Sequence, residues 1–233
     1  MPLPKISQPL FELTIPSSGD KVKYRPFTVK EEKILLIAQE SNDIDQVILS
    51  IKQILTNCLQ GYDINKLAVF DLEYVLLQIR AKAVNNQMTF KVIDPETEEE
   101  VELSLNVDDI TIVRSDKHTK LVDVTDNIKL SMKYPTIDFI RSLQGSEENQ
   151  ESALFDVMKA CIESVIEDET IYKIKDFTDE EVDSFIDSLD SKVINDIRDF
   201  FDTIPKMKYE AKYTTKDGKE KTFVAEGTET FFI

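Results

Sequence analysis

Hydrophobic and polar residues alternate with two different periods along this chain, and each period predicts a different secondary structure. Near the N-terminus, segments 10–15 and 21–25 alternate every second residue on either side of a polar turn, which predicts a β-hairpin. Thr28 lies three residues before Glu31, the spacing of a capping box, so a helix is expected to begin at Thr28. We expect this helix to carry the apolar block 34–38 into the core.

Two further helices are predicted by apolar residues that recur every three, four and seven positions. The first follows the cap Ser41–Asp43, has a well-defined amphipathic face and ends at Gly61. The second runs from about Lys66 to Val84 and is apolar over much of its circumference. A helix with so little polar surface is expected to lie at the centre of the fold.

The period changes after Asn86 from that of a helix to that of a strand. Residues 87–134 are therefore expected to form a small, mostly antiparallel sheet inserted between helical parts. Helices return at about 135–143 and 148–166. A second capping-box spacing at Thr178 predicts one long helix, with inward-facing residues as far as Phe201.

The last segment alternates again around Asp217–Gly218, which predicts a C-terminal β-hairpin followed by an apolar tail. The whole pattern predicts an α+β fold, mostly helical, with an N-terminal β-hairpin, a small inserted antiparallel sheet and a C-terminal β-hairpin. We expect four regions, folded as one or two compact units, with bounds 1–86, 87–134, 135–204 and 205–233.

The net charge of −17 changes this picture because it is concentrated in part of the chain. Residues 94–150 carry −8 and residues 151–204 carry −11, whereas both ends are nearly neutral. Such a field repels phosphate backbones, so no nucleic-acid partner is expected, although a basic protein partner could be attracted. An acidic mimic of DNA that blocks a host enzyme remains an alternative, but core residues interrupt its acidic face.

The candidate chemistry is sparse, so no enzymatic activity, cofactor, catalytic residue or metal ligand is expected. The five glycines lie far apart and form no phosphate-binding loop. His118, the only histidine, lies in a polar turn and is expected to be solvated. The acids of segment 94–102 are expected at a solvated hairpin tip, since they lack the spacing of a calcium loop. A carboxylate metal-dependent hydrolase remains a remote alternative.

Cys58 and Cys161 both fall in apolar helical patterns and are expected to be buried free thiols. Their separation indicates neither a disulfide framework nor a metal site. No run of the chain approaches the ~18 apolar residues of a membrane span, and no signal peptide is visible. We therefore expect a protein without a membrane partner that works in a reducing cytoplasm.

Two surface features are candidates for partner binding. The first is a basic strip at the end of the N-terminal hairpin and the start of the first helix, which is either an ordinary solvated face or a contact for an acidic partner. The second is the apolar tail, which either folds back onto the core or enters a groove of a partner. The candidate partner-binding residues are Arg25, Lys30, Lys33, Phe231 and Phe232.

The N-terminal sequence MPLPKISQPLFELTIPSSGDKVKYRPFTVKEEKILLIAQES is similar to the start of the baseplate hub proteins of T-even-type contractile-tailed bacteriophages. The most specific part is Y-R-P-F-x-V-K-E-E-K-x-L-L, which runs from Tyr24 to Leu36. MKYPT at Met132–Thr136 and the ending GTETFF resemble further landmarks of that family. The resemblance covers most of the chain but is specific only in residues 1–40.

This resemblance implies a protein that helps to build the central hub of the tail baseplate and catalyses no chemical step. The implied partners are the phage baseplate hub and tape-measure proteins. The acidic balance favours an assembly factor, or chaperone, that acts in the host cytoplasm. A permanent hub subunit, which would remain in the virion tail, is the alternative. The sequence does not indicate an oligomeric state.

Overall fold

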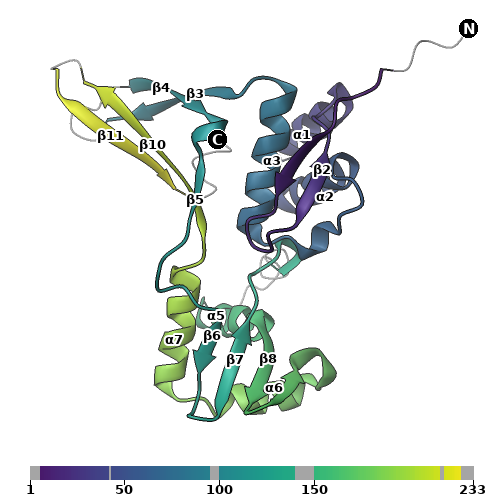
Figure 1. The fold of residues 1–233 in the computed structure, drawn as a ribbon, viewed down its shortest axis with the longest axis vertical. Helices are drawn as coiled ribbons and strands as arrows, with labels where there is room; N and C mark the ends of the chain where they lie inside the picture. The colour runs from purple at the N-terminus through teal and green to yellow at the C-terminus, as the bar shows by residue number, and fades with distance from the viewer. Residues whose placement is uncertain (1–5, 42, 95–99, 140–149, 216–217, 227–233) are drawn as a thin grey trace, which may run out of the picture. The chain divides into compact units, whose positions relative to one another are not determined.

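The computed structural model describes residues 6–41, 43–94, 100–139, 150–215 and 218–226. The chain divides into two compact units (Figure 1). Unit 1 consists of residues 1–113 and 206–233, and unit 2 consists of residues 114–205. Small antiparallel sheets and separate helices occur in both, which confirms the predicted α+β class. The chain thus enters unit 2 after residue 113, inside the region 87–134 that the sequence pattern treats as one sheet.

Unit 1 begins with the predicted hairpin, in which β1 (Phe11–Thr14) pairs antiparallel with β2 (Lys21–Tyr24). Gly19 closes the turn with a φ of 76°, a conformation that glycine adopts without a steric penalty. The helical part of the unit that follows contains α1 (Val29–Glu40), α2 (Ile44–Cys58), the 3₁₀ turn η1 (Ile64–Lys66) and α3 (Val69–Ala83).

Helix α3 is central to unit 1, as its apolar circumference predicts, and most of its residues are buried. It also buries two acids, Asp71 and Glu73. Asp71 accepts hydrogen bonds from the backbone amide of Ser17 at 2.8 Å and from that of Ala68 at 3.0 Å. This carboxylate therefore satisfies the first turn of α3 and fixes the turn of the β1–β2 hairpin to it.

Helix α1 departs from the prediction that the whole block 34–38 is buried. Ala38 is 2% exposed, but Leu36 and Ile37 are 54% and 65% exposed. Successive residues of a helix are rotated by about 100°, so five consecutive apolar residues cannot all face one side. The continuous apolar block was correctly predicted to be helical. It could not indicate which face of that helix is left exposed.

The rest of unit 1 is built from strands that are distant in sequence. β3 (Gln87–Ile93) and β4 (Glu100–Asn106) form one hairpin. A 3₁₀ turn η2 (Val107–Asp109) leads to β5 (Thr111–Val113), which pairs with β10 (Lys206–Thr214). β11 (Glu220–Glu226) completes the order β11–β10–β5. Leu77 of α3, Leu105 of β4 and Met207 of β10 share one buried cluster, so the C-terminal hairpin belongs to the core of unit 1.

Asp94 lies at the end of β3 and is not part of a solvated tip as expected. Its side chain is fully buried, Lys221 Nζ lies 2.9 Å from Oδ1, and the Tyr213 hydroxyl donates to Oδ2 at 2.5 Å. The partners come from the C-terminal hairpin, more than a hundred residues away, so the local acid-rich sequence gave no sign of them. Residues 95–99 of the same segment lie outside the described residues.

Unit 2 contains a four-stranded antiparallel sheet in the order β6–β7–β8–β9. Its strands are β6 (Leu121–Asp123), β7 (Ile128–Met132), β8 (Ile162–Glu167) and β9 (Thr170–Lys173). Its other elements are α5 (Gln150–Cys161), the 3₁₀ turn η3 (Ile174–Asp176), α6 (Asp179–Asp187) and α7 (Ser191–Asp202).

Two helix predictions in unit 2 are wrong in extent. The helix predicted over 148–166 ends at Cys161, and residues 162–167 form β8, where Ile162 and Ser164 are buried and Glu163 is exposed. A short run rich in β-branched residues is compatible with the period of a helix and with that of a strand. This run forms a strand because it pairs with β7. The long helix predicted from Thr178 is α6 followed by α7. The helix predicted over 135–143 is described only to residue 139, and residues 137–139 are helical.

Candidate docking surfaces

The basic strip centres on the junction between β2 and α1, where Arg25 and Glu31 form an ion pair. Arg25 Nη2 lies 2.9 Å from Glu31 Oε1, and Arg25 Nη1 also donates to the carbonyl of Pro26 at 3.0 Å. Glu31 accepts from the backbone amide of Thr28 at 2.9 Å and from the Thr28 hydroxyl. The expected capping residue Glu31 is therefore also the internal partner of Arg25.

The Glu31 carboxylate stays ionised despite being only 2% exposed. Burial raises its pKa, but the hydrogen bonds from Arg25 and Thr28 outweigh burial and lower the pKa to about 2. The hydrogen bond that Arg25 donates to Glu31 also raises the pKa of Arg25. The positive charge of Arg25 is thus largely balanced inside unit 1, which leaves little of it for a partner.

Lys30 and Lys33 lie on the exposed surface of α1, and no ion pair joins either of them to another described residue. Their contact with a partner stays a prediction. Phe231 and Phe232, the other candidate residues, lie outside the described residues. Of the five candidates, Arg25 is therefore paired inside unit 1, and Lys30 and Lys33 are exposed. The two phenylalanines of the tail are outside the part of the chain that the structure describes.

An apolar face of α1 was not anticipated from the sequence. Val29, Leu36 and Ile37 are 67%, 54% and 65% exposed, and their spacing places them on one side of the helix. Lys33 falls between them on the same side. Exposed apolar residues gathered on one helix face are typical of a protein-binding surface rather than of a solvated one.

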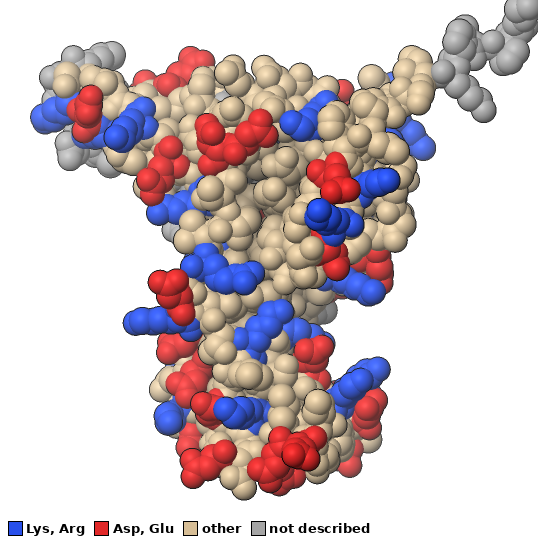
Figure 2. Space-filling view, viewed as in Figure 1, with Lys and Arg blue, Asp and Glu red and all other residues tan. Residues whose placement is uncertain are grey.

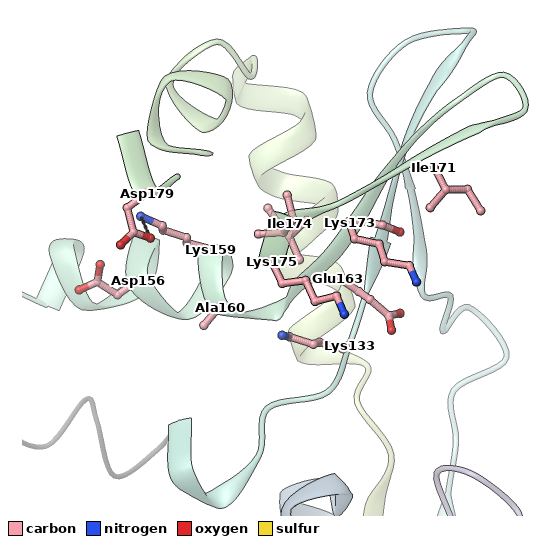
Figure 3. A pocket seen from close by; sticks show the side chains of 12 residues that line it. Lys133, Asp156, Lys159, Ala160, Glu163, Ile171, Lys173, Ile174, Lys175 and Asp179 are labelled. Carbon is pink, nitrogen blue, oxygen red and sulfur yellow. Dashed lines mark ion pairs between the residues drawn. The ribbon is translucent and has the colours of Figure 1, made fainter. Parts of the chain in front are cut away.

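Unit 2 contains a cavity of about 730 Å³ in which four of its lysines meet, although the unit carries 11 Lys and Arg against 22 Asp and Glu. We call it the lysine cavity (Figure 3). Its charged residues come from α5, β8, β9 and the segments beside them. The lysines are Lys133, Lys159, Lys173 and Lys175.

The lysines of this cavity differ in how they are paired. Lys159 lies 3.3 Å from Asp179 and 2.6 Å from Asp183, and hydrogen bonds to these acids raise its pKa. Lys133, Lys175 and Glu163 also line the cavity (Figure 3). No ion pair joins either of these two lysines to a residue in the described part of the chain, so their charge is available to an anionic group.

A second hollow of unit 2, of about 350 Å³, is lined mainly by apolar and aromatic side chains from β7, β8, β9, η3 and α6. We call it the aromatic groove. Its two rim acids are Glu167 and Glu181. Its apolar lining consists of Ile128, Val165, Tyr172, Ile174, Phe177, Val182 and Phe185.

The groove is open to solvent at its aromatic side chains. Tyr172 and Phe177 are 38% and 43% exposed, and their ring centroids lie 6.3 Å apart. The Tyr172 hydroxyl donates to Glu167 Oε2 at 3.2 Å, which orients the ring at the rim. Tyr172 lies in β9 and Phe177 just after η3, and their local sequence could not show that α6 forms the other wall of the groove.

His118 is not the solvated loop residue that was predicted, because it is half-buried and its ring packs against those of both Tyr134 and Phe200, with centroids 5.6 and 5.3 Å away. Its Nδ1 lies 2.9 Å from Thr203 Oγ1, and its Nε2 lies 2.9 Å from the Tyr134 hydroxyl. The Thr203 hydroxyl donates to the carbonyl of Asp199 at 2.6 Å. We call His118, Tyr134, Phe200 and Thr203 the His118 clasp.

The hydrogen-bond donors and acceptors around His118 indicate which of its ring nitrogens carries the proton. Since Thr203 gives its proton to a carbonyl, it accepts from Nδ1–H, and Nε2 then accepts from the Tyr134 hydroxyl. Burial and the charges of Arg114 and Lys120 lower the pKa of His118, which favours this neutral form. Both ring nitrogens are occupied, so His118 has no free nitrogen to act as a general base.

Both cysteines are buried free thiols, as predicted. Burial raises the pKa of Cys58 to about 11 and that of Cys161 to about 12, which disfavours the nucleophilic thiolate. Among the residues that the structure describes, no three His, Cys, Asp or Glu side chains are placed to hold a metal ion. No helix in the described ranges combines the length and apolar composition of a membrane span.

Comparison with known proteins gives one family match. The family model described as "T4 bacteriophage base plate protein" matches residues 8–233, which include nearly all of both units. No curated protein and no solved structure matches the chain.

Proposed function

The chain belongs to the T4 bacteriophage base plate protein family, and from this membership we propose that it promotes assembly of the baseplate hub by binding other tail proteins. The proposed partners are the hub proteins and the tape-measure protein, and no chemical step is catalysed. The observation that carries the proposal is the extent of the family match, since it spans both units and every surface described above.

The side chains support binding rather than catalysis. His118 uses both ring nitrogens inside the clasp, and the two thiols are buried with raised pKa values. In contrast, the exposed face of α1, the lysine cavity and the aromatic groove each present chemistry that a protein partner can cover. The beginning of the chain, with Arg25 and Glu31 in its most specific motif, also resembles the hub proteins.

We further propose that the chain is an assembly factor that leaves the hub, acting in the host cytoplasm. The charge supports this role, because a net charge of −17 keeps a complex with an apolar client in solution. A permanent hub subunit of the virion tail is the second candidate, and the family membership supports both equally.

Two measurements test the proposal. Affinity purification of the tagged chain from infected cells is expected to recover hub or tape-measure proteins, and recovery of no tail protein would refute the assembly role. Quantitative mass spectrometry of purified particles then separates the two candidates. Absence from the particle indicates an assembly factor, whereas a stoichiometric amount indicates a subunit.

A further inference from the structure

We propose that the aromatic groove of unit 2 binds a short segment of a partner tail protein, in which one or two large apolar side chains are flanked by Lys or Arg. This inference rests on the proposed function and adds to it the place and the chemistry of one contact. The apolar lining, the rim charges and the position of the lysine cavity each support a different part of it.

The lining indicates the apolar part of the partner segment. Apart from the two rim acids, all lining residues are aliphatic or aromatic, and Tyr172 and Phe177 leave large parts of their rings in water. A volume of about 350 Å³ is at the small end of the range for ligand pockets, so it accommodates one or two side chains rather than a folded surface. Aromatic side chains in such a hollow are the usual anchors of a peptide interface.

The walls of the groove are held before any partner arrives. β8 and β9 are joined by an antiparallel ladder in which Val165 lies opposite Tyr172. On the other wall, α6 begins with a capping box in which Glu181 accepts from the amide of Thr178 at 2.9 Å. Binding therefore does not require the groove itself to order, which keeps the entropic cost of binding low.

The rim indicates the charges of the partner segment. Glu167 and Glu181 border the groove, and exposed acids close to them in sequence are Asp168, Glu169, Asp176 and Glu180. Figure 2 shows acidic side chains gathered over the end of unit 2 that carries α6. A partner with Lys or Arg beside its apolar anchor is attracted to this rim, and an acidic partner is repelled.

The nearby lysines do not cancel this preference, because they line the other hollow. Successive side chains of a strand point to opposite faces, and on β9 this places Tyr172 at the groove while Ile171 and Lys173 line the lysine cavity. The two hollows of unit 2 therefore offer opposite charges, and a basic partner segment is directed to the aromatic groove.

The test uses the full chain and short overlapping peptides that tile the baseplate and tape-measure proteins of the phage that encodes it. At least one peptide with an apolar anchor and flanking Lys or Arg is expected to bind. Tyr172→Ser and Phe177→Ser are each expected to weaken this binding at least about ten-fold. Leu121→Ser, at a residue that is 46% exposed on β6 outside the groove, is the matched control and should leave binding unchanged.

A second variant tests the charges without disturbing the walls. Glu167→Gln with Glu181→Gln keeps an acceptor for the Tyr172 hydroxyl and for the α6 cap but removes both negative charges. We expect peptide binding to weaken several-fold at low salt and to match that of the wild type at high salt, because salt screens the charges. Thermal unfolding of every variant verifies that unit 2 is folded.

The outcomes separate this inference from the proposed function. If the wild-type chain recovers tail proteins but binds no tiled peptide, or if the two aromatic variants bind as the wild type does, the groove is not the docking site. A bound peptide with acidic flanks would also overturn the inference. If the wild-type chain recovers no tail protein from infected cells, the proposed function fails instead.

Discussion

The Glu31 carboxylate contacts the end of β2 and the start of α1 at once, since Arg25 and Thr28 both donate hydrogen bonds to it. The amide of Arg25 also donates to the carbonyl of Cys58 at 3.0 Å, at the end of α2. The buried acid thus joins β2 to α1, and the backbone of its partner Arg25 joins this junction to α2. Removing it would leave Arg25 without its internal counter-charge, which is the costly way to break such a pair.

We predict that Glu31→Ala lowers the free energy of unfolding of unit 1 by about 2–4 kcal/mol. Glu32→Ala is the matched control, because Glu32 is the exposed neighbour in the same helical turn, and its effect should stay within about 0.5 kcal/mol. Urea denaturation followed by circular dichroism measures both. Equal losses in the two variants would show that the ion pair contributes nothing.

Glu31 also predicts an acid-dependent loss of stability. Its pKa is about 2 in the folded chain against an ordinary value of 4.5, so the unfolded state binds more protons between these values. The stabilisation, about 3 kcal/mol, is complete above about pH 4.5 and is lost as the pH falls toward 2. Urea denaturation from pH 6 to pH 3 should show the wild type approaching Glu31→Gln in stability. A constant difference between them would contradict this assignment.

At the scale of the element, helix α7 begins where the sequence pattern predicted the middle of a longer helix. Asp190 Oδ1 accepts from the amide of Val193 at 2.9 Å, which is an N-cap. α6 ends at Asp187, and its C-cap residue Ser188 donates a hydroxyl hydrogen bond to the carbonyl of Phe185 at 2.6 Å. The apolar spacing continues across this break, so only the cap residue signals that a new helix starts.

We predict that Asp190→Ala lowers the free energy of unfolding of unit 2 by about 1 kcal/mol through loss of the cap. Asp187→Ala is the control, since Asp187 is the last residue of α6 and a negative charge there opposes the helix dipole. That control is expected to be neutral or slightly stabilising in the same thermal unfolding experiment. A larger loss at Asp187 than at Asp190 would refute the role of the cap.

Elements fixed by short-range signals were predictable from the sequence. The β1–β2 hairpin, the cap at Asp43 and the capping box at Thr178 all depend on residues within a few positions of one another. Features that depend on distant partners were not predictable. The β5–β10 pairing joins residues 111–113 to 206–208, and β8 becomes a strand only because β7 and β9 pair with it.

The candidate sites followed the same rule. A local motif was enough to name Arg25, Lys30 and Lys33 as candidates. The same motif could not show that Glu31 is buried and pairs with Arg25. The lysine cavity and the aromatic groove join side chains from separate elements, so their separate sequence segments gave no sign of either.

At the scale of the molecule, unit 2 is one continuous insertion into unit 1, because residues 114–205 lie between β5 and β10. It contains its own four-stranded sheet and carries a charge of −11 of the total −17. The His118 clasp joins the residues just after its entry to those just before its exit. The hydrogen bonds of His118 to Thr203 and Tyr134 are both internal to unit 2.

We therefore predict that residues 114–205 fold when expressed alone. A two-dimensional amide NMR spectrum should show well-dispersed signals, and thermal unfolding should be cooperative. His118→Ala in the same fragment is expected to lower its melting temperature, because Tyr134 and Thr203 lose their shared partner. Collapsed NMR signals from the wild-type fragment would show that unit 2 needs unit 1 to fold.

The His118 clasp also has a consequence for the order of folding. β5 and β10 can pair only after the chain between residues 113 and 206 has been closed into a loop, and longer loops cost more entropy. Once unit 2 has folded and His118 has bound Thr203, the flexible part of that loop is roughly ten-fold shorter, which lowers the closure cost by about 2 kcal/mol. The insertion is then the nucleus that brings the two halves of unit 1 together, and mutations in the clasp should slow the folding of a sheet that they do not touch.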